Sequence, residues 1–271
     1  GEFPLVIYSH GNGGLRYVSS FMTEHLASHG FVVLAPDHTG NTALDTFLGT
    51  DDETEQVALD RPLDVSAVID AVESGGTGLE EIAAVTDTDD VAVTGHSFGG
   101  YTALVLAGGA SGQPADERVD AIVGLAPASS RITDDTLTAV DVPTLLVSGT
   151  LDETTPVDDD TVRPAEQVTG RPLVRADIDG AGHQSFTDIC SYLEIAQTRT
   201  DLPPALVEAI EDYAVEGCAP ELIDFAEAHR VTNRLATAFL LDALYDDQGY
   251  TALLSEPADE DQPLAVLDYA A

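Results

Sequence analysis

A serine enclosed by glycines, at the junction of an apolar run and a helical pattern, constrains this chain more than any other feature. The apolar run Val91-Ala92-Val93-Thr94 leads into Gly95-His96-Ser97-Phe98-Gly99, and residues 101–107 have the composition of a helix. Glycines are needed there because the turn is so sharp that side chains would clash with the strand and the helix. The pattern predicts that Ser97 lies at the exposed end of a buried strand. The helix N-terminus and the N–H of Phe98 would face any oxyanion formed there. Alone, the motif also fits a glycine-rich turn without chemistry.

The remaining pattern indicates one α/β domain over residues 1–271. Apolar runs predict further strands at residues 4–9, 30–36, 119–126, 142–149 and 172–178, the last being the final strand of the sheet. Helical spacing is found at residues 18–29, 61–73 and 225–244. Residues 187–224 predict a helical cap or flanking segment outside the sheet. We expect an acidic, irregular stretch at residues 43–60, polar turns at 87–90 and 256–262, and a packed or frayed tail at 263–271.

Two further residues complete a nucleophile–base–acid set with Ser97. Asp152 follows the strand at 142–149, and His183 lies in a Gly-rich loop after the strand at 172–178. The order Ser, Asp, His with each member just past a strand end is the order of α/β-hydrolases. His183 would be the general base for Ser97, and Asp152 would fix its tautomer. Taken singly, Asp152 is one acid among many, with Glu153 as its neighbouring competitor.

The loop after the first strand predicts the second oxyanion donor. It reads His10-Gly11-Asn12-Gly13-Gly14, and we assign the donor to the N–H of Asn12, with Phe98 as the first donor. His10 is expected to hold this loop by a hydrogen bond. Asp37 and His38 are predicted to be loop residues of the segment 37–42 that shape a substrate pocket. The run 158–160 is predicted to be a solvated acidic surface rather than a cation site.

Net charge excludes several classes of partner. The chain has 49 Asp and Glu residues against 10 basic ones, all of them Arg, and a formal net charge of −39. Nucleic-acid binding needs clustered Lys or Arg, so we expect no nucleic-acid partner. No apolar stretch is long enough for a membrane span. Self-repulsion of this size is relieved by salt, which suggests adaptation to a saline habitat; a solubility feature without salt dependence is the alternative.

The two cysteines, Cys190 and Cys218, lie in the same C-terminal segment. Their even number and proximity permit one disulfide, and two separate buried thiols are the alternative. Their spacing does not fit a zinc site. The first residue is Gly1, and a core strand is expected already at residue 4, so we expect further residues upstream in the natural protein.

Four motifs together resemble the α/β-hydrolase superfamily: Ser9-His10-Gly11-Asn12, Gly95–Gly100, Gly149–Asp152 and Gly182–Phe186. Within it, the chain is similar to predicted dienelactone hydrolases, platelet-activating-factor acetylhydrolase-like enzymes and cutinase-like polyester hydrolases. The resemblance implies an α/β-hydrolase fold, a serine esterase without cofactor or metal, and a secreted or periplasmic location.

The expected activity is hydrolysis, through an acyl-enzyme, of neutral short- to medium-chain esters. The substrate would be a small or polymeric ester, aliphatic polyesters included. The alternatives are a peptidase or acyltransferase with the same triad, or a non-catalytic binding module. Against the last, Ser97, Asp152 and His183 are all present.

Overall fold

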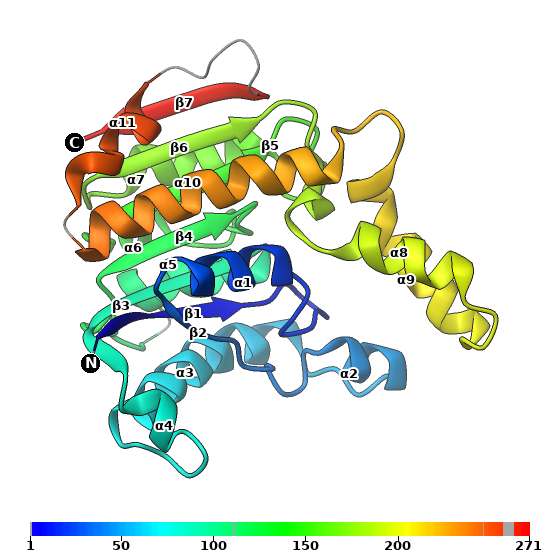
Figure 1. Ribbon diagram of the computed structural model, residues 1–271, viewed down its shortest axis with the longest axis horizontal. Coiled ribbons are helices and arrows are strands. Elements are labelled where there is room, and N and C mark those ends of the chain that lie inside the picture. The colour runs from blue at the N-terminus through cyan, green and yellow to red at the C-terminus, as the bar shows by residue number, and fades with distance from the viewer. Residues whose placement is uncertain (1, 111, 246, 257–262) are drawn as a thin grey trace.

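The computed structural model describes residues 2–110, 112–245, 247–256 and 263–271. Its centre is a seven-stranded sheet in the order β2-β1-β3-β4-β5-β6-β7 (Figure 1). All neighbouring strands are parallel except β6 and β7, which are antiparallel. The strands are β1 (Phe3–Ser9), β2 (Val32–Leu34), β3 (Thr86–His96), β4 (Ala121–Leu125), β5 (Thr144–Gly149), β6 (Leu173–Ile178) and β7 (Leu264–Ala270). This mostly parallel sheet, flanked by helices, is the α/β-hydrolase fold predicted from the sequence.

Helices cover both faces of the sheet because successive side chains of each strand point to opposite faces and both sets are apolar. On β1, Val6 and Tyr8 face one core, and Leu5 and Ile7 face the other. The first core is covered by α1 (Ser20–Ser28), α10 (Phe225–Tyr245) and α11 (Thr251–Ser255), and the second by α3 (Thr54–Glu73), α5 (Phe98–Gly108), α6 (Asp134–Ala139) and α7 (Arg163–Gln167). The remaining helical elements are α2 (Ala43–Leu48), α4 (Glu80–Ala83), the π-helical turn η1 (Asp158–Val162), the 3₁₀ turns η2 (His183–Phe186) and η3 (Gln248–Tyr250), α8 (Ile189–Thr198) and α9 (Pro204–Cys218). No helix among the described residues is long and apolar enough to cross a membrane.

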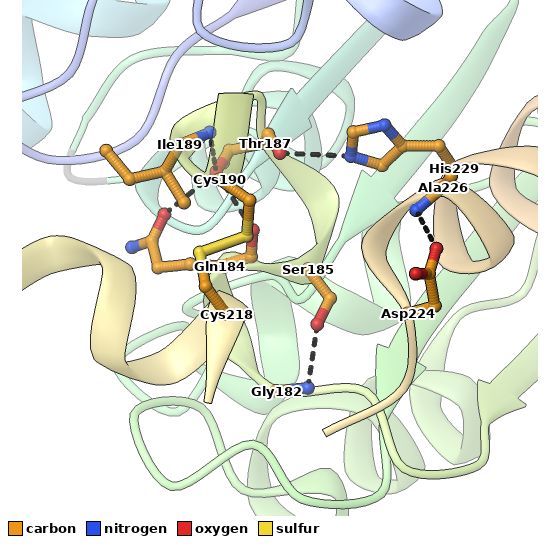
Figure 2. The surroundings of a disulfide bond; sticks show 10 residues. All are labelled: Gly182, Gln184, Ser185, Thr187, Ile189, Cys190, Cys218, Asp224, Ala226 and His229. Atoms are coloured by element: carbon orange, nitrogen blue, oxygen red, sulfur yellow. Dashed lines mark hydrogen bonds between the residues drawn. A yellow bond between two sulfur atoms is a disulfide. The ribbon is translucent and has the colours of Figure 1, made fainter. Parts of the chain in front are cut away.

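The segment 187–224 forms a pair of helices, α8 and α9, beyond the carboxyl ends of the parallel strands (Figure 1). Cys190 in α8 and Cys218 at the end of α9 form a disulfide, so the alternative of two separate thiols is wrong. Figure 2 shows this bond beside Gln184 and Thr187, which precede α8. The helix pair has only a small core of its own, in which Ile189, Cys190 and Ala214 are buried.

Three expectations about local structure are wrong. Residues 43–60 are not irregular: α2 begins there behind a capping box formed by Thr42 and Asp45, and α3 begins at Thr54. Residues 87–90 are not a turn before the central strand but part of β3, where a register shift against Pro4 and Leu5 accommodates them. The strand at 173–178 is not the last, because the tail forms β7 along its free edge. The acidic turn expected at 256–262 falls almost wholly outside the described residues.

Candidate active site

The turn after β3 presents Ser97 under backbone strain. Ser97 has φ +56°, a left-handed conformation that a non-glycine residue adopts only at a cost. The two flanking glycines are required by packing: a Cβ on Gly99 would lie 1.8 Å from the carbonyl oxygen of Ser9, and one on Gly95 would lie 2.4 Å from the backbone of Gly99. The sharp turn predicted from the glycine pattern is therefore present, and Ser97 stands at the start of α5.

The structure brings Ser97, His183 and Asp152 into one hydrogen-bonded series. The Oγ of Ser97 lies 2.9 Å from Nε2 of His183, and Nδ1 of His183 lies 2.8 Å from Oδ2 of Asp152. Burial pushes the pKa of Asp152 upward, but the hydrogen bonds from His183 and Thr155 outweigh it and hold this pKa below its ordinary value. An ionised Asp152 accepts the Nδ1–H of His183, which leaves Nε2 free to accept the proton of Ser97. The competitor Glu153 is exposed and has no part in this series.

Two residues that sequence reasoning missed hold the series in place. Thr155 donates its N–H to Oδ1 of Asp152 at 2.7 Å and its hydroxyl to Oδ2 at 2.7 Å. Nε2 of His96 donates to the backbone oxygen of His183 at 2.9 Å. Burial lowers the pKa of His96 to about 3, so its ring is neutral. His96 stands beside the serine in the sequence motif, and Thr155 follows Asp152 by three positions, so position alone could have pointed to both.

The two expected oxyanion donors lie at the ends of β1 and β3. Phe98 is the first residue of α5, where a backbone N–H has no acceptor within the helix. Asn12 lines the same cavity as Ser97. Its side-chain Oδ1 accepts a hydrogen bond from Nδ2 of Asn41 at 2.8 Å. His10 holds the loop as expected, with Nδ1 donating to the oxygen of Gly11 at 2.8 Å.

The cavity above Ser97 has a volume of about 250 Å³ and is closed on one side by α9. Tyr213 and Glu216 of this helix line it, together with Gln184 and Thr187. Glu216 contributes the one carboxylate among the residues that line this cavity, and it accepts a hydrogen bond of 2.7 Å from the hydroxyl of Thr154. The helix pair therefore forms part of the site.

The segment 37–42 does not shape this cavity as expected. The Asp37 carboxylate forms an ion pair with Arg16 at 2.6 Å. His38 is 1% exposed, because its ring is enclosed between Ser9 and Asp64. The Oγ of Ser9 lies 2.9 Å from Nε2 of His38, and Nδ1 of His38 lies 2.8 Å from Asp64. These distances equal those around Ser97, but Ser9 is fully buried and cannot meet a substrate.

The acidic run at 158–160 is a solvated surface only in part, because Asp158 and Asp159 are exposed as expected but the third residue is not. Asp160 is buried, and its Oδ1 accepts the N–H of Ser130. Within the described ranges, no group of three or more His, Cys, Asp or Glu side chains is arranged to hold a metal ion.

Comparisons with known proteins find similarity to acetylhydrolases and to a chlorophyllase. The family model "Platelet-activating factor acetylhydrolase, isoform II" matches residues 1–74, which include the loop with Asn12. A chlorophyllase type 0 of Chenopodium album is 30% identical over 137 residues, 50% of this chain and 37% of that protein. A platelet-activating factor acetylhydrolase of Canis lupus familiaris is 28% identical over 139 residues, 38% of this chain and 31% of that protein. The chain thus spans about a third of the length of these curated relatives. The expected resemblance to platelet-activating-factor acetylhydrolase-like hydrolases is confirmed.

Proposed function

We propose that this chain is a serine carboxylic-ester hydrolase in which Ser97 is the nucleophile, His183 the general base and Asp152 the acid that orients it. The observation that carries the proposal is the series Ser97–His183–Asp152, which begins at a strained residue lining the cavity. The similarity to acetylhydrolases and to a chlorophyllase supports hydrolysis of esters in general.

The mechanism follows from the positions of these atoms. The Oγ of Ser97 attacks the ester carbonyl carbon while Nε2 of His183 takes its proton, and Asp152 stabilises the resulting imidazolium. The negative oxygen of the tetrahedral intermediate accepts hydrogen bonds from the N–H groups of Phe98 and Asn12. His183 then protonates the leaving alcohol. Water repeats the sequence on the acyl-enzyme and releases the acid.

Charge and cavity size favour neutral esters with a short to medium acyl chain as substrates. Segments of aliphatic polyesters belong to this class. Glu216 faces the cavity, and the chain carries a net charge of −39, so anionic substrates are repelled. A cavity of about 250 Å³ holds an acyl group of modest length. The disulfide between Cys190 and Cys218 supports an oxidising, secreted or periplasmic location, because such bonds persist there.

The test is hydrolysis of p-nitrophenyl esters with acyl chains of increasing length, in high salt, by the parent and by Ser97→Ala. The matched control is Ser130→Ala, which changes an exposed serine outside the cavity. We expect activity that is highest on short to medium chains, retained by Ser130→Ala and lost by Ser97→Ala. A folded parent that hydrolyses no ester would contradict the proposal. Cleavage of a p-nitroanilide peptide would then indicate a peptidase, and inactivity on both substrates a binding module.

A further inference from the structure

A fully buried cation, Arg61, lies beside Phe98 of the second core. Arg61 in α3 is 0% exposed, although arginine is almost never fully buried. Its Nη1 donates to Oδ1 of Asn41, its Nη2 to the hydroxyl of Ser9 at 3.1 Å and to the oxygen of His10, and its Nε to the hydroxyl of Thr102 at 3.1 Å. Four acceptors from three segments thus enclose one guanidinium group.

Three of these acceptors, Ser9, His10 and Thr102, belong to the two segments that carry the proposed oxyanion donors. Ser9 is the last residue of β1, and His10 is the first residue of the loop that contains Asn12. Thr102 lies in α5, one turn after Phe98, and its hydroxyl also donates to the oxygen of Phe98 at 2.8 Å. The guanidinium carbon lies 4.9 Å from the centre of the Phe98 ring. One planar group therefore contacts both sides of the expected oxyanion hole.

A further hydrogen bond extends this contact to Asn12 itself. Asn41 accepts from Arg61 through its Oδ1 and donates through its Nδ2 to Oδ1 of Asn12 at 2.8 Å. The side chain of Asn12 is thereby fixed, and its backbone N–H with it. A lysine could not reproduce this arrangement, because its ammonium is a point donor without the rigid fork of a guanidinium.

The buried charge is balanced at a distance through Ser9 and His38. The Ser9 hydroxyl accepts from Arg61 and donates to Nε2 of His38, whose Nδ1 donates to Asp64. Burial lowers the pKa of Arg61 to about 9, which still leaves the group charged at neutral pH. The Ser9–His38–Asp64 series therefore connects Arg61 to a carboxylate whose charge raises the pKa of Arg61.

We propose that Arg61 is a positioning residue for the oxyanion hole: its guanidinium fixes the Asn12 loop against the start of α5, so that the N–H groups of Asn12 and Phe98 converge on one oxygen. The proposal rests on the proposed esterase function, since it needs an oxyanion to form above Ser97. Arg61 acts through Asn41, Ser9 and Phe98 and does not itself touch substrate.

The experiment compares Arg61→Met, Arg61→Lys and Asn41→Ala with the parent. Asn41→Ala retains the cation and its contacts with Ser9, His10 and Thr102, but removes the Nη1 acceptor that connects Arg61 to Asn12, so it decides the question if Arg61→Met fails to fold. Arg118→Met is the control: Arg118 is hydrogen-bonded to Asp70, Glu73 and Asp116, outside the cavity. Active sites are counted with a p-nitrophenyl phosphonate. The kcat per titrated site, the KM and the dissociation constant of an alkyl boronic acid are measured for each variant.

We expect kcat per site to fall roughly 10- to 100-fold in Arg61→Met and less in Arg61→Lys and Asn41→Ala, with KM nearly unchanged, because loss of a whole oxyanion donor costs ~10²–10³ in rate. Boronic-acid affinity should fall by a similar factor, since its tetrahedral adduct needs the same donors. Arg118→Met should lower Tm and leave kcat per site unchanged.

Folded variants with kcat per site and boronic-acid affinity within twofold of the parent would overturn the assignment of Arg61 while leaving the esterase function intact. A parent that neither hydrolyses esters nor reacts with the phosphonate would instead refute the proposed function, and the positioning role with it.

Discussion

Removing the disulfide should loosen the helix pair before it affects the sheet. The bond spans a sequence separation of 28, between Cys190 and Cys218. In the chain-entropy account, a loop of that length contributes about 3.5 kcal/mol, between ~3 for 15 residues and ~4.7 for 100. The helix pair has only three buried members in its own core, so apolar burial within it cannot replace that contribution. We therefore expect Cys190→Ala/Cys218→Ala to lose about 3.5 kcal/mol of stability, most of it in α8 and α9.

The loss should extend to the active site, because the end of α9 packs on the loop of His183. A Cβ on Gly182 would lie 2.4 Å from the oxygen of Glu216, and one on Gly217 would lie 2.8 Å from the Cβ of Gln184. Once α9 is released, Glu216 no longer closes the cavity.

The assay combines urea unfolding with amide hydrogen exchange, at fixed high salt, on the parent and on Cys190→Ala/Cys218→Ala. Faster exchange should be confined to α8, α9 and the adjacent turn η2, while β3, β4 and β5 remain protected. Parent protein treated with reductant should behave as the variant does. A stability difference below about 1 kcal/mol, or unchanged exchange in α9, would refute this reasoning.

Three other predictions concern charge. Tm should rise with NaCl concentration because salt screens the net charge of −39, and a flat curve would contradict adaptation to salt. Burial lowers the pKa of His10 and His96 to about 3 and of His229 to about 4, so below pH 6.5 the unfolded chain binds protons that the native chain does not. Each of these histidines should thus lower stability by up to about 1.4 kcal/mol per pH unit as pH falls below 6.5, and a urea midpoint equal at pH 7 and pH 5, in salt that screens the net charge, would disprove it. Finally, Glu216→Gln should raise kcat/KM about fivefold on a p-nitrophenyl ester with an anionic acyl group, because it removes a charge repulsion of ~1 kcal/mol. The kcat/KM on the neutral analogue of this ester should not change. Equal changes on both esters would exclude charge as the cause.

Motifs that combine chain order with local geometry could be predicted from the sequence. The turn at Ser97 is specified by Gly95 and Gly99, because any Cβ there would meet backbone atoms. Asp152 and His183 follow from their places after successive strands, since parallel strands bring their carboxyl ends to one edge of the sheet.

Features that depend on distant segments could not be predicted. β7 pairs with the free edge of β6 although residues 179–263 separate the two strands. The short apolar pattern of β7 does not indicate which strand it pairs with. Three of the residues 87–90 are aspartates of low strand propensity, yet the segment lies in β3, where β1 pairs with Asp87 before the register shift and with Val91 after it. Arginine is normally a surface residue, so the sequence does not indicate that Arg61 is buried. Only the assembled fold brings together the acceptors that satisfy its guanidinium group.

The buried series Ser9–His38–Asp64 can be compared directly with the proposed catalytic series, because both consist of a serine, a histidine and an aspartate. Its two donor–acceptor distances match those of Ser97–His183–Asp152, so spacing alone does not make a serine reactive. The difference lies in the surroundings of the hydroxyl oxygen: the Oγ of Ser9 is buried and accepts a hydrogen bond from Arg61, whereas Ser97 lines a cavity. A template search based on side-chain distances would thus find two triads in this chain, and a covalent probe should label one.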